Sequence, residues 1–211
     1  MIQIGPLSPT LISEKPLAPL GAAWTTPQLA IAKDNAYAYK LLARFAYTRW
    51  LYGYAFNFNV PATAQILGVL VELNRKCSST STHGGDFRIT DALGEGAGAY
   101  KDDPDHWITG DNIVYVPYGS SSSLWSLALT PAWINSSAFG YWFQVTNNSS
   151  GSRTFSVDHV RMSVFYEPAS PLAAYRAQKG FVSGYHCFMK QYMDFSNRGL
   201  APLKLPDGSL W

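Results

Sequence analysis

The stretch "TFSVDHVRMSVFYEP", residues 154–168, decides the fold class because its apolar side chains alternate with polar ones. Phe155 and Val157 occupy odd positions, whereas Val160, Met162, Val164 and Tyr166 occupy even ones. Alternation of period 2 is typical of a β-strand with one buried face. A slip of one residue turns every later side chain to the opposite face. The change of parity therefore predicts a β-bulge at Asp158 or His159.

Segments of the same kind precede this strand at turn-separated intervals. We predict strands at residues 48–60, 64–77, 86–93, 112–119, 124–129, 139–145 and 154–168. Residues 24–42 fit either a helix that begins at Pro27 or a turn at "KDN" followed by a strand. Helices of the length that parallel strands need are absent between the strands. The expected fold class is all-β: an antiparallel, jelly-roll-like β-sandwich with extended N- and C-terminal arms.

Three parts of the chain differ in composition. Residues 1–23 hold four prolines among apolar side chains, which predicts a Pro-rich N-terminal docking arm. Residues 24–167 form the predicted β-sandwich domain. Residues 168–211 are aromatic and interrupted by prolines, and we interpret them as a C-terminal arm. Both arms are too apolar for free linkers, so each is expected to dock on another protein surface.

The low content of charge narrows the choice of partners. Charged residues make up 14% of the 211 residues, against about 25% in a typical soluble domain. Much of the surface is therefore expected to be covered by other protein. The net charge of +2 comes from scattered basic residues, which argues against nucleic acid and membrane partners. The first residues lack the features of an export signal, and no apolar run is long enough to span a membrane, so synthesis and retention in a cytosol are expected.

Residues that could carry chemistry are scattered. The four histidines, His83, His106, His159 and His186, show no metal-ligand spacing and are expected to be structural. Cys77 and Cys187 lie far apart, and we interpret them as ordinary thiols, with a disulfide between them as the alternative. The three sequons, at Asn135, Asn147 and Asn148, are interpreted as turn markers.

Two loops allow a functional interpretation beside a structural one. Asp102, Asp103 and Asp105 could ligate calcium, although a solvated acidic turn explains them as well. The glycine-rich residues 94–100 could cradle a phosphate, but they lead into this acidic turn rather than into a helix, which favours a flexible connection. No catalytic residue, metal or cofactor is predicted, and the chain is not expected to be an enzyme.

Aromatic side chains are the most abundant unusual feature, with thirteen Tyr, eleven Phe and seven Trp residues. Exposed rings would favour a carbohydrate-binding module, whereas inward rings would fill a sandwich core. Most rings fall on the inward positions of the predicted strands, which favours the core. Trp50, Trp133 and Trp142 are the best candidates for exposed aromatic contacts, because Trp142 lies off the main face and the other two lie near turns.

Four segments in a fixed order suggest a family. They are "WTTPQLAIAKDNAYA" (24–38), "YGYAFNFNVPATAQILGVLVELNRK" (52–76), "LWSLALTPAWINSSAFGYWFQV" (124–145) and "FSVDHVRMSVFYE" (155–167). Their order resembles that of the β-sandwich structural modules of tailed-bacteriophage virions, found among capsid decoration and tail-associated proteins. The resemblance leaves both predicted arms uncovered. Many relatives carry Trp-Gly where this chain has Trp125 and Ser126, so a different local turn is expected there.

The resemblance implies a structural function in the virion, with no catalytic residues. The chain is expected to be a capsid decoration (cement) protein that stabilises the shell through contacts made by its arms. A trimer of the chain and the major capsid protein are the expected partners, and assembly is expected in the host bacterial cytoplasm. Two alternatives remain: a tail or head–tail component, and a carbohydrate-binding module or receptor-binding head.

Overall fold

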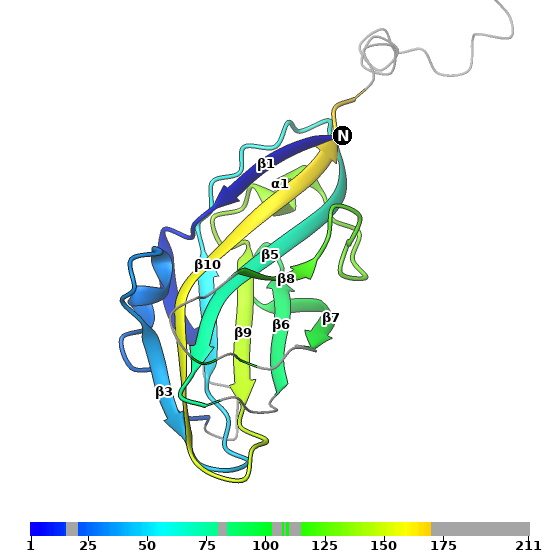
Figure 1. Ribbon diagram of the computed structural model, residues 1–211. Coiled ribbons are helices and arrows are strands. Elements are labelled where there is room, and N and C mark those ends of the chain that lie inside the picture. Colours follow the sequence, from blue (N-terminus) through cyan, green and yellow to red (C-terminus); the bar gives the residue numbers. More distant parts are fainter. Residues whose placement is uncertain (16–20, 80–83, 103–106, 108, 110–114, 170–211) are drawn as a thin grey trace, which may run out of the picture. The chain divides into compact units, whose positions relative to one another are not determined.

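The computed structural model describes residues 1–15, 21–79, 84–102, 107, 109 and 115–169 (Figure 1). Within these ranges ten strands and two short helices occur. The strands are β1 (Ile2–Leu7), β2 (Leu11–Lys15), β3 (Ala38–Leu42), β4 (Trp50–Tyr54), β5 (Gln65–Cys77), β6 (Gly84–Thr90), β7 (Gly96–Asp102), β8 (Tyr115–Gly119), β9 (Gly140–Thr146) and β10 (Arg153–Glu167). The helices are the 3-10 helix η1 (Pro27–Ile31) and α1 (Pro131–Ile134).

The strands form two antiparallel five-stranded sheets that pack as a sandwich. The first sheet has the order β1-β10-β5-β8, and β3 also pairs with β10; the second has the order β2-β4-β9-β6-β7. Each connection leads from one sheet to the other, except that β6 and β7 are consecutive neighbours in the second sheet. This alternation confirms the predicted all-β, jelly-roll-like sandwich.

The predicted bulge lies in β10, the long strand at the centre of the first sheet. Val157 pairs with Arg75 on β5, but His159 pairs with the next residue, Asn74, so Asp158 is the extra residue. The side chains on both sides of the bulge therefore point into the core, as their burial shows for Val157 and Val160. The parity change in the sequence thus located this irregularity correctly.

The N-terminal residues correct one prediction. Residues 1–15, which we call the N-terminal ribbon, are part of the sandwich and not a separate docking arm. Ile4 on β1 pairs with Val164 on β10, and Ser13 on β2 pairs with Tyr52 on β4. The prediction was wrong because it took the prolines as evidence against a strand. Proline is tolerated in an edge strand, where its missing N–H is not needed for a hydrogen bond to a neighbouring strand.

One aromatic segment also departs from its predicted strand. The predicted strand 48–60 ends at Tyr54, and Ala55, Asn57 and Asn59 follow with φ values of 60°, 56° and 55°. The intervening apolar residues are nevertheless buried. Asn tolerates the left-handed region better than most residues. Buried and exposed side chains therefore alternate along this segment as in a strand, although it is not assigned to either sheet.

Further differences concern short connections. Residues 24–42 form η1 and then β3, so both interpretations of that segment were partly correct. Residues 124–129 are turns rather than a strand, and Trp125 and Ser126 have φ values of 55° and 60°. The glycine-rich residues 94–100 contribute most of β7 instead of a flexible connection.

The core lies between the sheets and is filled mainly by aromatic and β-branched side chains. Among the largest fully buried side chains are Trp107, Trp125, Tyr141, Phe87 and Phe143. The indole N–H of Trp125 donates to the carbonyl of Val69 at 3.0 Å, so its one polar atom is satisfied inside the core. Except for Pro168 and Ala169, the predicted C-terminal arm, residues 168–211, lies outside the described residues.

Candidate functional site

Two of the three tryptophans predicted to be exposed are buried, and this corrects the sequence interpretation. Trp50 and Trp142 are 4% and 6% exposed. With Tyr52 they form a small cluster separate from the main core, which we call the outer aromatic cluster. Its residues lie opposite one another on β4 and β9, where Tyr52 pairs with Trp142. Rings from neighbouring strands cover one another, a contact that spacing along one segment does not reveal.

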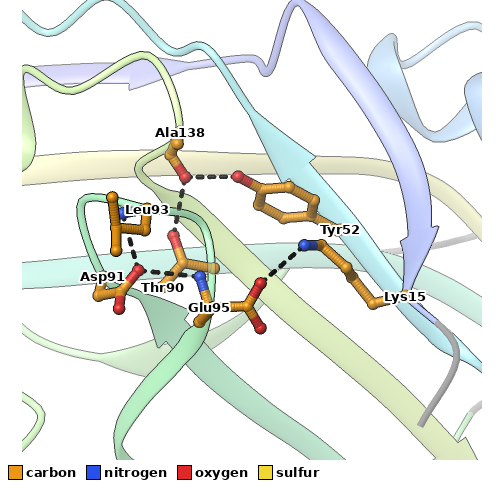
Figure 2. A network of polar contacts seen from close by, with 7 residues as sticks. All are labelled: Lys15, Tyr52, Thr90, Asp91, Leu93, Glu95 and Ala138. Carbon is orange, nitrogen blue, oxygen red and sulfur yellow. Dashed lines mark hydrogen bonds and ion pairs between the residues drawn. The ribbon is translucent and has the colours of Figure 1, made fainter.

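Side chains from both edges of the second sheet complete the cover of this cluster. The ammonium group of Lys15 lies 5.4 Å from the Tyr52 ring centroid and 5.9 Å from that of Trp142. Lys15 is held there by Glu95 at 3.0 Å, as Figure 2 shows. The Tyr100 ring lies 6.2 Å from Trp50. The outer aromatic cluster is therefore a satellite core and not a flat platform for sugar rings.

The polar groups beside this cluster are used for structure. The hydroxyl groups of Tyr52 and Thr90 both donate to the carbonyl oxygen of Ala138, at 2.5 and 3.1 Å (Figure 2). Burial is the main cause that raises the pKa of Tyr52 above its ordinary value, so the hydroxyl keeps its proton. The Asp91 carboxylate accepts backbone N–H bonds from Leu93 and Glu95 and thereby closes the β6–β7 turn.

Trp133, the third candidate, is half-buried and anchored. It lies in α1, where Thr130 caps the helix by accepting the Trp133 backbone N–H. Its indole N–H donates to the carbonyl of Thr90 at 2.9 Å. The ring thus attaches the short helix to β6, and its polar atom has a partner within the fold.

Only some of the residues that could carry chemistry lie in the described part of the chain. His159 lies in β10 and Cys77 is a buried free thiol, whereas His83, His106, His186 and Cys187 lie outside the described residues. Asp103 and Asp105 also lie outside them, and the side chain of Asp102 is not described. Within the described ranges no group of three or more His, Cys, Asp or Glu residues could hold a metal ion.

A different surface carries exposed apolar side chains, and the sequence interpretation missed it. Tyr39 and Leu41, on β3, are 43% and 61% exposed, and Phe45, in the turn that follows, is 64% exposed. The Arg44 guanidinium lies 4.3 Å from the Phe45 ring centroid. We call these four residues the β3-turn surface. Tyr, Phe and Arg are enriched where proteins contact one another, so its composition suits protein docking.

The backbone at Phe45 is strained. Its φ is 62°, in the left-handed region that a bulky residue seldom adopts. Three backbone hydrogen bonds fix this conformation: Phe45 N–H to Asn147 O, Asn147 N–H to Ala46 O, and Ala46 N–H to Ala43 O, at 2.7, 2.9 and 3.1 Å. A conformation of this kind persists only where the surrounding structure maintains it.

A buried asparagine side chain stabilises this turn through hydrogen bonds. Asn147 is fully buried, and its side-chain amide donates to the carbonyls of Leu42, Ala43 and Gly151 at 3.0, 3.2 and 2.9 Å. Its carbonyl oxygen accepts from the Ser149 backbone N–H at 3.0 Å. The bonds to Leu42 and Ala43 hold the turn that carries Phe45, and the bonds to Gly151 and Ser149 order the 147–151 turn beside it. The exposed Phe45 ring thus stands on a backbone ordered before any partner arrives, which lowers the entropic cost of docking.

Sequence signals for this surface were weak. Leu41 and Phe45 lie in "KLLARFAY", a segment whose helix and turn interpretations were both open. The left-handed conformation of Phe45 depends on Asn147, about a hundred residues later, so no local pattern indicates it. The "NNSS" sequence at 147–150 was interpreted as a turn marker, and that signal was correct but incomplete.

Comparisons with known proteins add no relative. No protein-family model, no curated protein and no solved structure matches the chain. In the described part of the chain, none of the helices has both the length and the apolar character needed to cross a membrane.

Proposed function

We propose that this chain is a non-enzymatic structural protein of a tailed-phage virion, most simply a capsid decoration protein that stabilises the shell. The observation that carries the proposal is the β3-turn surface: exposed apolar side chains on a turn that a buried asparagine holds rigid. Such a surface serves contact with protein rather than chemistry. The order of the four sequence segments that resemble virion modules supports the same function.

The sandwich fold supports the proposal only in a general way. Jelly rolls occur in viral capsid domains and also in lectins, and a fold alone does not determine function. The low charge of 14% adds a second argument, because a surface covered by neighbouring subunits needs fewer charged groups. Scattered basic residues speak for protein partners and against nucleic acid or membrane.

The sequence predicted that both terminal arms dock on other subunits; the mechanism we propose gives up the N-terminal arm. The N-terminal ribbon pairs with its own sandwich, so the β3-turn surface takes over the docking function. Residues 168–211 remain the proposed second attachment. Burial of apolar area contributes about 25 cal/mol per Å², and a particle with many copies multiplies weak contacts through effective concentration. Expected partners are other copies of the chain, as a trimer, and the major capsid protein.

The test is reconstitution on particles. Virions are prepared from a phage in which the gene for this chain is deleted, and purified chain is added and sedimented with them. Wild-type chain is expected to sediment with the particles, and the Phe45→Gly variant is expected to lose at least tenfold in affinity. Leu93→Ala is the matched control, because Leu93 is 83% exposed on the β6–β7 turn, away from the β3-turn surface.

The outcomes separate the alternatives. Failure of the wild-type chain to bind any particle would contradict the proposal. Binding confined to tails, seen by electron microscopy of labelled chain, would replace decoration with a tail or head–tail function. Binding to a glycan array that Trp142→Ala abolishes, with the fold intact, would favour a carbohydrate-binding module; the burial of Trp50 and Trp142 argues against this outcome.

A further inference from the structure

A polar cluster on the first sheet fastens the N-terminal ribbon. The Ser8 hydroxyl, in the connection between β1 and β2, lies 2.8 Å from His159 Nε2. The Tyr115 hydroxyl, on β8, lies 2.6 Å from Nδ1 of the same imidazole. One ring on β10 therefore joins the ribbon to a strand of the sandwich body. Because both hydroxyls can donate or accept, a neutral imidazole satisfies the two bonds together.

Positive charge borders this imidazole. The Arg161 guanidinium, two residues along β10, lies 3.7 Å from the Tyr115 ring centroid. The Lys33 ammonium group lies 5.4 Å from the same ring. Arg161 also donates two hydrogen bonds of 2.9 Å to the Glu72 carboxylate on β5, so the charge of Glu72 is engaged by Arg161.

The other acidic groups near the cluster are directed elsewhere. Asp158 is 1% exposed, and its Oδ1 accepts the backbone N–H groups of Asp34 and Asn35 at 3.3 and 3.0 Å. The Asp34 carboxylate accepts the Ala36 N–H at 2.9 Å. Among the described residues, neither carboxylate forms a hydrogen bond with His159, so a charged imidazole would have no direct acidic partner.

These surroundings favour the neutral imidazole. His159 is 7% exposed. Burial, followed by the charges of Arg161 and Lys33, lowers its pKa from 6.5 to about 4, while Asp34 and Glu72 act in the opposite direction to a smaller extent. At neutral pH the ring is thus an uncharged bridge between two hydroxyl groups.

We propose that His159 is an acid-sensitive latch: protonation of its imidazole releases the N-terminal ribbon from the sandwich. Once charged, the ring is repelled by Arg161 and Lys33 and moves toward water on the side of Ser8, which is exposed. The ribbon loses its anchor at that point. Release of β1 frees the edge of β10 from Met162 to Tyr166, where a strand of another chain can pair. This inference does not depend on the proposed function.

The direction of the pH effect follows from the two protonation states. Above pH 6.5 the imidazole is neutral whether the ribbon is bound or released, so protonation does not shift the equilibrium toward the released ribbon. Below that pH the released state takes up the proton first, since only in the bound state is the pKa lowered to about 4. The ratio of released to bound ribbon is expected to rise on the order of 50-fold between pH 7.5 and 4.5.

Hydrogen exchange of the full chain tests the latch. Protection factors, corrected for intrinsic exchange, are measured for amides of β1 and of β5 between pH 7.5 and 4.5, in wild type and in His159→Gln. In the wild-type chain, the protection factors of the β1 amides are expected to fall tens of times further between pH 7.5 and 4.5 than those of the β5 amides. In His159→Gln, which keeps polar contacts but cannot titrate, β1 protection is expected to stay within a few fold. Equal loss of β1 protection in both proteins would overturn the proposal.

A second measurement uses the wild-type chain alone and therefore does not depend on whether a variant folds. The His159 ring protons are followed by NMR in the wild-type chain as the pH falls. Titration well below pH 6, in step with the loss of β1 protection, supports the latch. Titration near 6.5, or titration that leaves β1 protected, overturns it.

Discussion

The outer aromatic cluster and the β3-turn surface both place aromatic rings outside the main core, yet the rings of the cluster are buried whereas those of the β3-turn surface are exposed. At the cluster, Trp50 and Trp142 are 4% and 6% exposed, because rings on β4 and β9 pack together under Lys15. At the turn, Phe45 is 64% exposed, because it lies in the turn that follows β3 rather than within a strand of the sheet. The number and size of aromatic residues therefore say little about which of them meet a partner; the neighbouring strands decide.

Replacing Trp142 by Ala tests the buried side of this comparison and has the largest expected effect. Removal of a tryptophan that is 94% covered leaves a cavity under Lys15, and a loss of about 3 kcal/mol in the free energy of unfolding is expected. Urea denaturation measures it. Tyr100→Ala, at a ring that is 52% exposed, is the control and is expected to lose less than about 1 kcal/mol. Equal losses in the two variants would mean that the cluster is an open surface after all.

Asn147→Ala tests whether the turn is rigid. The change leaves the carbonyls of Leu42, Ala43 and Gly151 without their amide donor, and a loss of about 2 kcal/mol is expected. Faster hydrogen exchange of the Phe45 amide should accompany it. The neighbouring Asn148 is exposed, so Asn148→Ala is expected to change stability by less than about 0.5 kcal/mol. A turn that stays protected in Asn147→Ala would argue against preorganisation.

Phe45→Gly separates stability from function. Glycine adopts a φ of 62° without strain and the removed ring is mostly exposed, so the variant is expected to gain about 1 kcal/mol in stability. Docking to particles is expected to weaken at the same time. Thermal unfolding and the sedimentation assay measure the two effects. A variant that is less stable than wild type would indicate that the ring packs on its own fold and is not held out for a partner.

Lys15→Met tests the cover of the outer aromatic cluster and has the smallest expected effect. The substitution keeps an apolar chain over Tyr52 and Trp142 but removes the ion pair with Glu95, which is 61% exposed. Partly exposed pairs contribute about 0–1 kcal/mol, so a loss below about 0.5 kcal/mol is expected. The difference from wild type should shrink further in 1 M salt. A loss of several kcal/mol would show that the charge, and not the packing of rings, holds the cluster.

The sequence predicted those parts of the fold that depend on local periodicity. Antiparallel sandwich architecture and the bulge at Asp158 both followed from the period-2 pattern and its change of parity. Strand pairing was beyond reach: Ile4 pairs with Val164, and one sequence carries no local mark of a partner 160 residues away. For that reason residues 1–23, which include the N-terminal ribbon, were interpreted as a docking arm.

The same limit explains the candidate sites. Trp142 was expected to be exposed because it lies off the main face of its strand, but cover from Tyr52 and Lys15 comes from other strands. Phe45 gave no signal, since its left-handed backbone is fixed by the distant Asn147. Contacts between residues far apart in sequence thus determine that Trp142 is buried and that the Phe45 ring is exposed.

Photo-crosslinking inside assembled particles is the most direct measurement of whether Phe45 contacts a partner. A photoreactive phenylalanine analogue is placed at Phe45 in one preparation and at Leu93 in another, and virions that carry each chain are irradiated. Position 45 is expected to crosslink efficiently to another virion subunit or to a second copy, while position 93, although 83% exposed, is not. Particles that lack the chain, or equal crosslinking from both positions, would contradict this expectation.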